Sequence, residues 1–170
     1  MNIYLIWLFR IIHIVAGVFW VGGTLMMTFF IAPTVGATAE AGQKFVGHLM
    51  GNLKFSARMS AAAGLTILAG FILYWNDSNG FTSAWMTSGA GTGFGIGAGF
   101  AIIGFIFGIL LGRTTKAMAM LGTNMQGKPS PEEMTQMQVF QKRQVTYSYL
   151  ASAALLLALI FMSIARYFVF

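Results

Sequence analysis

Four long stretches of apolar residues, separated by shorter polar connections, dominate the chain. They cover about residues 3–32, 56–75, 91–112 and 145–168, and Pro33 is expected to end the first helix. A helix needs about 20 predominantly apolar residues to cross a bilayer, because a rise of roughly 1.5 Å per residue must cover about 30 Å of hydrocarbon. The stretches show no strict alternation, which favours helices over barrel strands. The pattern therefore predicts an all-α integral membrane protein, an antiparallel four-helix bundle, with residues 1–170 as a single transmembrane domain.

The polar connections contain helix signals of their own. Ser130, Pro131 and Glu133 form an N-cap, a first-turn proline and a capping-box partner, and no helix breaker follows before the fourth apolar stretch. We expect this helix to project several turns beyond the membrane. Residues 40–55 also suggest a helix, leading into the second apolar stretch. Residues 76–90, rich in Gly, Ser and Thr, are expected to form a loop.

The positive charges predict the orientation in the membrane. Eight of the ten Lys and Arg residues fall in or beside two connections, namely Lys44, Lys54, Arg58, Arg113, Lys116, Lys128, Lys142 and Arg143. Only Arg10 and Arg166 belong to the opposite side. Short cytoplasmic connections are enriched in Lys and Arg, so we expect both basic connections, with their helical extensions, in the cytoplasm and both termini outside. The cations are too dispersed to indicate a nucleic-acid partner.

Composition limits the chemistry. Hydrophobic residues make up 57% of the chain and charged residues 8%, outside the usual range for soluble domains. The chain has no Cys, which excludes disulfides and thiolate metal sites. Its four acids lie outside the apolar stretches, at Glu40, Asp77, Glu132 and Glu133. With no nucleophile visibly paired with a base, the sequence predicts no catalytic residues and leaves open whether the protein is an enzyme.

Two ionisable residues inside the first apolar stretch are candidates for a binding site. Arg10 and His13 are three residues apart and share a helix face. One interpretation is haem b, with His13 as an iron ligand and Arg10 near a propionate. Met162 is expected at a depth similar to that of His13, with Arg166 on the same face of the fourth helix. The geometry therefore allows Met162 as a second iron ligand and Arg166 as a partner of the second propionate. His48 is expected roughly 20 Å or more from His13.

The same residues allow an alternative without a cofactor. His13 would then donate a hydrogen bond to a neighbouring helix, while Arg10 extends toward the headgroups. Glycines at four-residue steps, Gly104, Gly108 and Gly112, mark one face of the third stretch. They favour close helix packing, either inside the bundle or against another protomer or subunit.

The first apolar helix also carries a family resemblance. Residues 10–23, Arg-Ile-Ile-His-Ile-Val-Ala-Gly-Val-Phe-Trp-Val-Gly-Gly, resemble the opening helix of cytochrome b-like bacterial membrane proteins. That group includes copper-resistance D-type proteins, the membrane part of certain bacterial urate oxidases and related four-helix proteins. Residues 55–59 and 127–133 are similar to the same group. The resemblance implies a bacterial plasma (inner) membrane protein in which the position of a proposed haem ligand is His13.

Two functions follow as expectations. The first is a haem b-binding, cytochrome b-like subunit for electron transfer. The second is a cofactor-free structural or accessory subunit, which packs in the lipid bilayer against other membrane subunits or a second copy of itself.

Overall fold

The computed structural model describes residues 1–125 and 129–169, and it is helical almost throughout. Lys128, one of the cations counted above, lies outside the described residues. In chain order the elements are α1 (Ile3–Met26), the π-helical turn η1 (Met27–Ile31), α2 (Ala32–Ala37), α3 (Ala39–Gly51), α4 (Phe55–Asp77), the 3-10 turn η2 (Ala84–Thr87), α5 (Gly89–Asn124), α6 (Pro131–Ile164) and the 3-10 turn η3 (Ala165–Tyr167). The described residues contain no strand.

Four continuous helical segments are long and apolar enough to cross a membrane. They are Ile3–Ala37, Phe55–Asp77, Gly89–Asn124 and Pro131–Tyr167, of 35, 23, 36 and 37 residues. At about 1.5 Å per residue, even the shortest exceeds the roughly 30 Å of a hydrocarbon core. The predictions of an all-helical chain and of four apolar helices of membrane-spanning length are confirmed.

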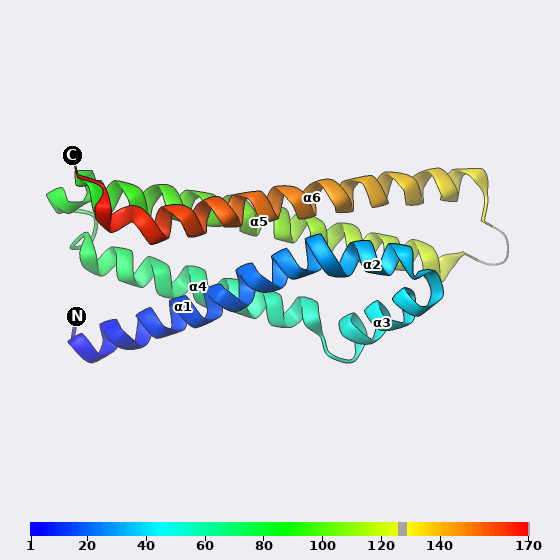
Figure 1. Cartoon of the computed structure of the whole chain (residues 1–170), viewed down its shortest axis with the longest axis horizontal. Coiled ribbons are helices and arrows are strands. Elements are labelled where there is room, and N and C mark those ends of the chain that lie inside the picture. The colour runs from blue at the N-terminus through cyan, green and yellow to red at the C-terminus, as the bar shows by residue number, and fades with distance from the viewer. Residues whose placement is uncertain (126–128, 170) are drawn as a thin grey trace.

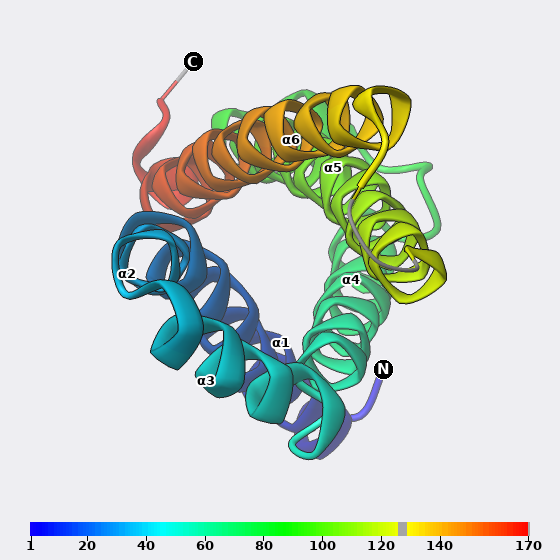
Figure 2. The ribbon, with the colours of Figure 1, turned by 90° about the vertical axis from the view of Figure 1, so that its right-hand side faces the viewer.

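The long helices run back and forth along the long axis of the molecule (Figure 1). Both termini lie at one end, which we call the terminal end. The turn between α2 and α3 lies near the other end, the α2–α3 end, where α6 begins. The closest packing occurs within two pairs, α1 with α4 and α5 with α6, and contacts between the pairs are sparser. Viewed from the α2–α3 end, the helices form a ring (Figure 2).

The buried core is small and rich in alanine. Buried alanines dominate where the helices meet, at Ala62, Ala63, Ala69, Ala151, Ala154, Ala158 and Ala165. Trp20 and Leu155 are the large apolar residues in the core, and the Trp20 ring meets Phe105 edge to face with 6.2 Å between ring centroids. The molecule exposes 10847 Å², against about 8,200 Å² for a soluble monomer of the same mass. Many large apolar side chains form this outer surface, as expected where lipid is the solvent.

Pro33 does not end the first helix, contrary to our expectation. The helix passes through a π turn, in which the Ala32 N–H donates to the carbonyl of Met27 five residues earlier, and continues to Ala37. Proline lacks an N–H and its ring clashes with the carbonyl four residues before it. Local π geometry relieves this conflict and lets membrane helices tolerate proline.

Other local expectations differ in detail. Residues 40–55 contain a helix, α3, but it is separated from α4 by a turn in which Lys54 adopts a left-handed conformation with φ of 49°. At the start of α6, the capping box is confirmed: the Ser130 N–H donates to Glu133 Oε2 at 2.7 Å, and the Glu133 N–H donates to Ser130 Oγ at 3.2 Å. Both α5 and α6 extend beyond the apolar stretches toward the α2–α3 end.

Candidate functional site

His13 lies where α1 crosses α4, and its imidazole hydrogen-bonds to the neighbouring helix. Its Nδ1 is 2.7 Å from the backbone carbonyl oxygen of Thr66. Because a carbonyl oxygen only accepts, Nδ1 must carry the proton in a neutral ring. Nε2 then keeps an unprotonated lone pair, and it has no hydrogen-bond partner among the described residues. The ring is half-buried.

Glycines allow this close approach of α1 and α4. A Cβ atom on Gly70 would lie 2.7 Å from His13 Cε1, so the imidazole packs directly on the Gly70 backbone. One turn along α1 from His13, a Cβ on Gly17 would lie 3.4 Å from Thr66 Cγ2. The Thr66 hydroxyl donates to the carbonyl of Ala62 at 2.8 Å and is satisfied within α4. His13, Gly17, Thr66 and Gly70 therefore form one built contact, which we call the His13 site.

Sequence reasoning identified His13 but did not pair it with α4. Thr66 and Gly70 are four residues apart, so they lie on one face of the helix. This spacing puts Gly70, which has no side chain, on the same helix face as Thr66, whose carbonyl accepts the hydrogen bond from His13. Such a pair is a weak signal, because small residues are common at helix contacts in membranes.

The predicted second ligand contacts a different helix. A Cβ on Gly97 would lie 3.1 Å from Met162 Cγ and 3.3 Å from Met162 Cε, so the thioether packs on α5. The His13 ring contacts α4 instead. The contacts recorded for Met162 and for His13 are therefore with different helices, and His48 is exposed in the last turn of α3. Met162 as a ligand stays a prediction.

The two arginines of the predicted site are exposed. Arg10 lies on α1 one turn before His13, and Arg166 lies in η3 at the end of the last helical segment. Neither forms an ion pair among the described residues, where the salt bridge recorded is Lys44 Nζ to Glu40 Oε1 at 2.8 Å. Both guanidinium groups are therefore available to an anionic group on the terminal side of His13.

No family model, curated protein or solved structure matches this chain. The resemblance of the first helix to cytochrome b-like proteins therefore stays a prediction. What the chain can do must be argued from its own residues.

Polar contacts also join α1 to the second helix pair. The buried Ser152 hydroxyl of α6 donates to the Thr28 hydroxyl in the π turn at 3.0 Å. Phe29, next in the turn, meets the Tyr149 ring edge to face with 5.6 Å between centroids. These contacts fix the register between α1 and α6.

The three glycines at four-residue steps on α5, Gly104, Gly108 and Gly112, do not all serve the same kind of packing. A Cβ on Gly104 would lie 2.8 Å from Leu155 on α6, so this glycine serves packing inside the molecule. A Cβ on Gly108 or on Gly112 would meet nothing within 4 Å, and both glycines face outward.

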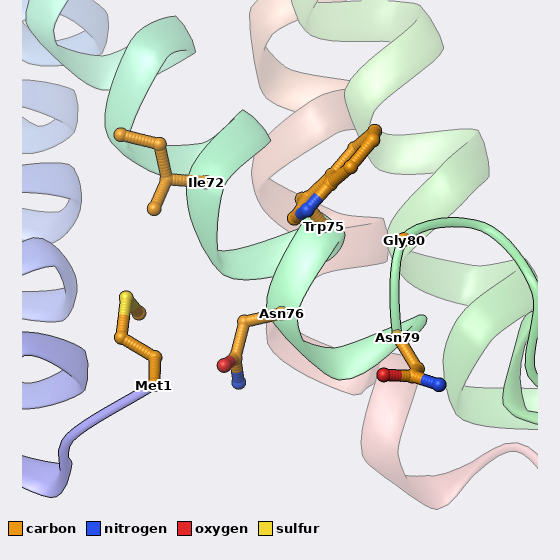
Figure 3. A pocket seen from close by; sticks show the side chains of 6 residues that line it. All are labelled: Met1, Ile72, Trp75, Asn76, Asn79 and Gly80. Carbon is orange, nitrogen blue, oxygen red and sulfur yellow. The ribbon is translucent and has the colours of Figure 1, made fainter.

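Two hollows among the described residues lie away from His13. One, of about 300 Å³, lies at the terminal end and is lined by Met1, Ile72, Trp75, Asn76, Asn79 and Gly80 (Figure 3). Another, of about 370 Å³, is a shallow surface feature at the start of α6. The described residues also contain no group of three His, Cys, Asp or Glu side chains that could hold a metal ion.

Proposed function

We propose that the protein is an antiparallel four-helix bundle in a bacterial plasma membrane, with both termini outside and the α2–α3 end in the cytoplasm. The support is the distribution of charge. Seven of the described cations lie toward the α2–α3 end, among them those of α5 and α6, whereas Arg10 and Arg166 lie on the terminal side. Positively charged connections are retained in the cytoplasm during insertion.

We further propose that the protein is a cytochrome b-like redox subunit in which His13 binds haem b. The observation behind this proposal is the 2.7 Å contact between His13 Nδ1 and the Thr66 carbonyl. Histidines that bind metals usually donate their other ring N–H to a carbonyl or carboxylate, which fixes the tautomer and the ring orientation. The His13 site holds the imidazole in the state that a ligand needs, with a free lone pair on Nε2.

The residues around the site fit a haem in part. His13 would supply one axial ligand, and Arg10 and Arg166 would pair with the propionates. Bound haem b supplies one-electron oxidation and reduction at its iron. Thr66 would keep the imidazole oriented, and the apolar faces of α1 and α6 would exclude water. The packing of Met162 on Gly97 favours a single protein ligand.

A cofactor-free accessory subunit is the second candidate, and the same contact supports it. The Nδ1 hydrogen bond and the packing on Gly70 give His13 a complete role as a link between α1 and α4. The outward-facing Gly108 and Gly112 offer surface for other membrane subunits or a second copy.

An oxidised-minus-reduced visible spectrum of detergent-purified protein, expressed with haem supplied, tests the first candidate. We expect haem bands in the wild type and a loss of haem occupancy of at least about tenfold in His13→Gln, because weaker outer-shell changes already cost tenfold or more. Glutamine keeps an N–H donor for the Thr66 carbonyl but lacks the imidazole, so the helix contact is preserved. His48→Gln is the matched control and should keep the bands.

Either contrary result decides against haem at this site. If folded wild type contains no haem after haem-supplemented expression, the accessory subunit is the remaining candidate. If His13→Gln keeps full haem occupancy, the ligand is another residue, and Met162→Leu becomes the variant to compare.

A further inference from the structure

Four cations lie on α5 and α6 toward the α2–α3 end. Arg113 and Lys116 lie on α5, and Lys142 and Arg143 lie on α6; all four are exposed. We call them the basic belt. An arginine can hold a phosphate group through two N–H donors.

A hydrogen bond between the helices sets the four cations at one level. Gln144 Nε2 of α6 donates to Thr115 Oγ1 of α5 at 3.0 Å. Lys116 and Arg143 are the immediate chain neighbours of this pair. Arg113 and Lys142 lie two residues from it, which is about 3 Å along a helix. The belt therefore forms a narrow band across both helices.

The belt has no acidic partner on its own helices. The sequence of α5 contains no Asp or Glu, and the acids of α6 are confined to its first turn, at Glu132 and Glu133. Glu133 precedes Lys142 by nine residues, or about 14 Å along the helix, which exceeds the screening length of about 8 Å at physiological ionic strength. On α3, Glu40 already pairs with Lys44. The positive charge of the belt is uncompensated within the described residues.

The belt also lies at a change in the exposed surface. Toward the terminal end, the large exposed side chains next to it are apolar or aromatic, at Ile109, Val145 and Tyr149. Toward the α2–α3 end, the exposed surface becomes mixed: α6 exposes Gln136, Gln138 and Gln141 alongside Met134 and Val139, and α5 exposes Met120. A mainly apolar surface that changes to cations and then to a mixed polar surface matches the passage from lipid chains to the headgroup region.

We propose that the basic belt binds the phosphate headgroups of anionic phospholipids in the leaflet at the α2–α3 end. The complementarity is one of charge and depth: the cations are unpaired, and they lie where the mainly apolar surface becomes mixed. Because the four cations are exposed on two helices at one level, the occupants are lipids of one leaflet. This inference does not depend on haem binding.

Binding of phosphatidylglycerol to detergent-purified full-length protein tests the proposal, with phosphatidylcholine as the neutral comparison. We expect the wild type to prefer phosphatidylglycerol and the variant with Arg113, Lys116, Lys142 and Arg143 all changed to Gln to bind it at least about tenfold more weakly. A variant that keeps the charge, R113K with R143K, should retain most of the preference. Lys44→Gln removes a cation that is already paired and should leave binding unchanged.

Three outcomes would overturn the proposal. Equal binding of the two lipids by the wild type would remove the preference, and undiminished binding by the quadruple variant would place it elsewhere. Competition by inorganic phosphate at the concentration of the lipid would show a site for free phosphate. If the quadruple variant fails to fold, the salt dependence of the wild type decides: exposed charges predict that added NaCl weakens phosphatidylglycerol binding, and salt-independent binding contradicts the proposal.

Discussion

A neutral imidazole inside an apolar helix must form hydrogen bonds, because burying an unpaired polar group costs free energy. His13 meets this need with the Thr66 carbonyl, 2.7 Å from Nδ1. That one contact has two consequences. It links α1 to α4, and it leaves Nε2 as the atom that can bind a ligand. The structural role of His13, through Nδ1, is therefore compatible with ligand binding through Nε2. A substitution that keeps the hydrogen bond to Thr66 but removes Nε2 tests the two roles separately.

The packing of His13 on Gly70 gives a prediction at the same scale. Gly70→Ala adds a Cβ only 2.7 Å from His13 Cε1, which is too close for two carbon atoms that are not bonded. We expect a loss of about 1 to 3 kcal/mol in the free energy of unfolding, typical of overpacking. Unfolding of the purified protein in mixed micelles measures it.

Gly64→Ala on the same helix is the matched control, because a Cβ there meets nothing within 4 Å. It should leave stability unchanged or raise it by up to about 1 kcal/mol, since alanine favours helix over glycine. Equal effects of the two substitutions would contradict the close packing of His13 on Gly70.

Among the elements, the π turn η1 decides how α1 meets α6. Pro33 cannot donate a backbone hydrogen bond, and the turn before it widens to accommodate the missing bond. The turn contains Thr28, which is buried and accepts from Ser152. A proline that the sequence pattern predicts to end the helix thus lies near a buried polar contact between the helix pairs.

A double-mutant cycle tests this contact. Thr28→Val and Ser152→Ala each remove one hydroxyl, and we expect a coupling free energy of about 0.6 kcal/mol, the usual size for hydrogen bonds between membrane helices. Unfolding free energies of the wild type, both single variants and the double variant provide it. Pairing Ser152→Ala with Thr34→Val should give no coupling, because the Thr34 hydroxyl bonds to Phe30 within its own helix. Coupling of equal size in both cycles would contradict a specific contact.

At the scale of the whole molecule, two closely packed helix pairs are joined by few contacts, and most apolar side chains face outward. This arrangement suits a bilayer, where leaving lipid gives helices little hydrophobic gain and small residues govern the packing. It also explains why the core consists mainly of alanine and why glycines mark the sites of closest approach.

Orientation is the prediction at this scale. The chain has no Cys, so single cysteines can be introduced at exposed positions on opposite ends, Asn79→Cys and Gln136→Cys. In intact cells a membrane-impermeant maleimide should label position 79 at once and position 136 only after permeabilisation, because the basic connections are expected inside. The reverse pattern would invert the orientation, and immediate labelling of both positions would contradict four crossings.

Several features were predictable from the sequence because their causes are local. The four apolar helices follow from the length and composition of their stretches, and the capping box follows from the spacing of Ser130 and Glu133. The course of the chain at Pro33 and Lys54 was not predictable in this way. In both places the backbone adopts a conformation that its local preference disfavours.

The sequence by itself determined that this protein is helical and apolar, because backbone groups in lipid must bond within their own segment. It also determined which ionisable groups lie within the apolar helices, because hydropathy fixes that directly. Only the tertiary structure decided that His13 donates to Thr66, that Met162 packs on Gly97 and that the four cations of the belt share one level. These facts depend on which helix faces meet and in what register. Helix neighbours in lipid are selected by shape and by single hydrogen bonds, which an apolar pattern does not encode.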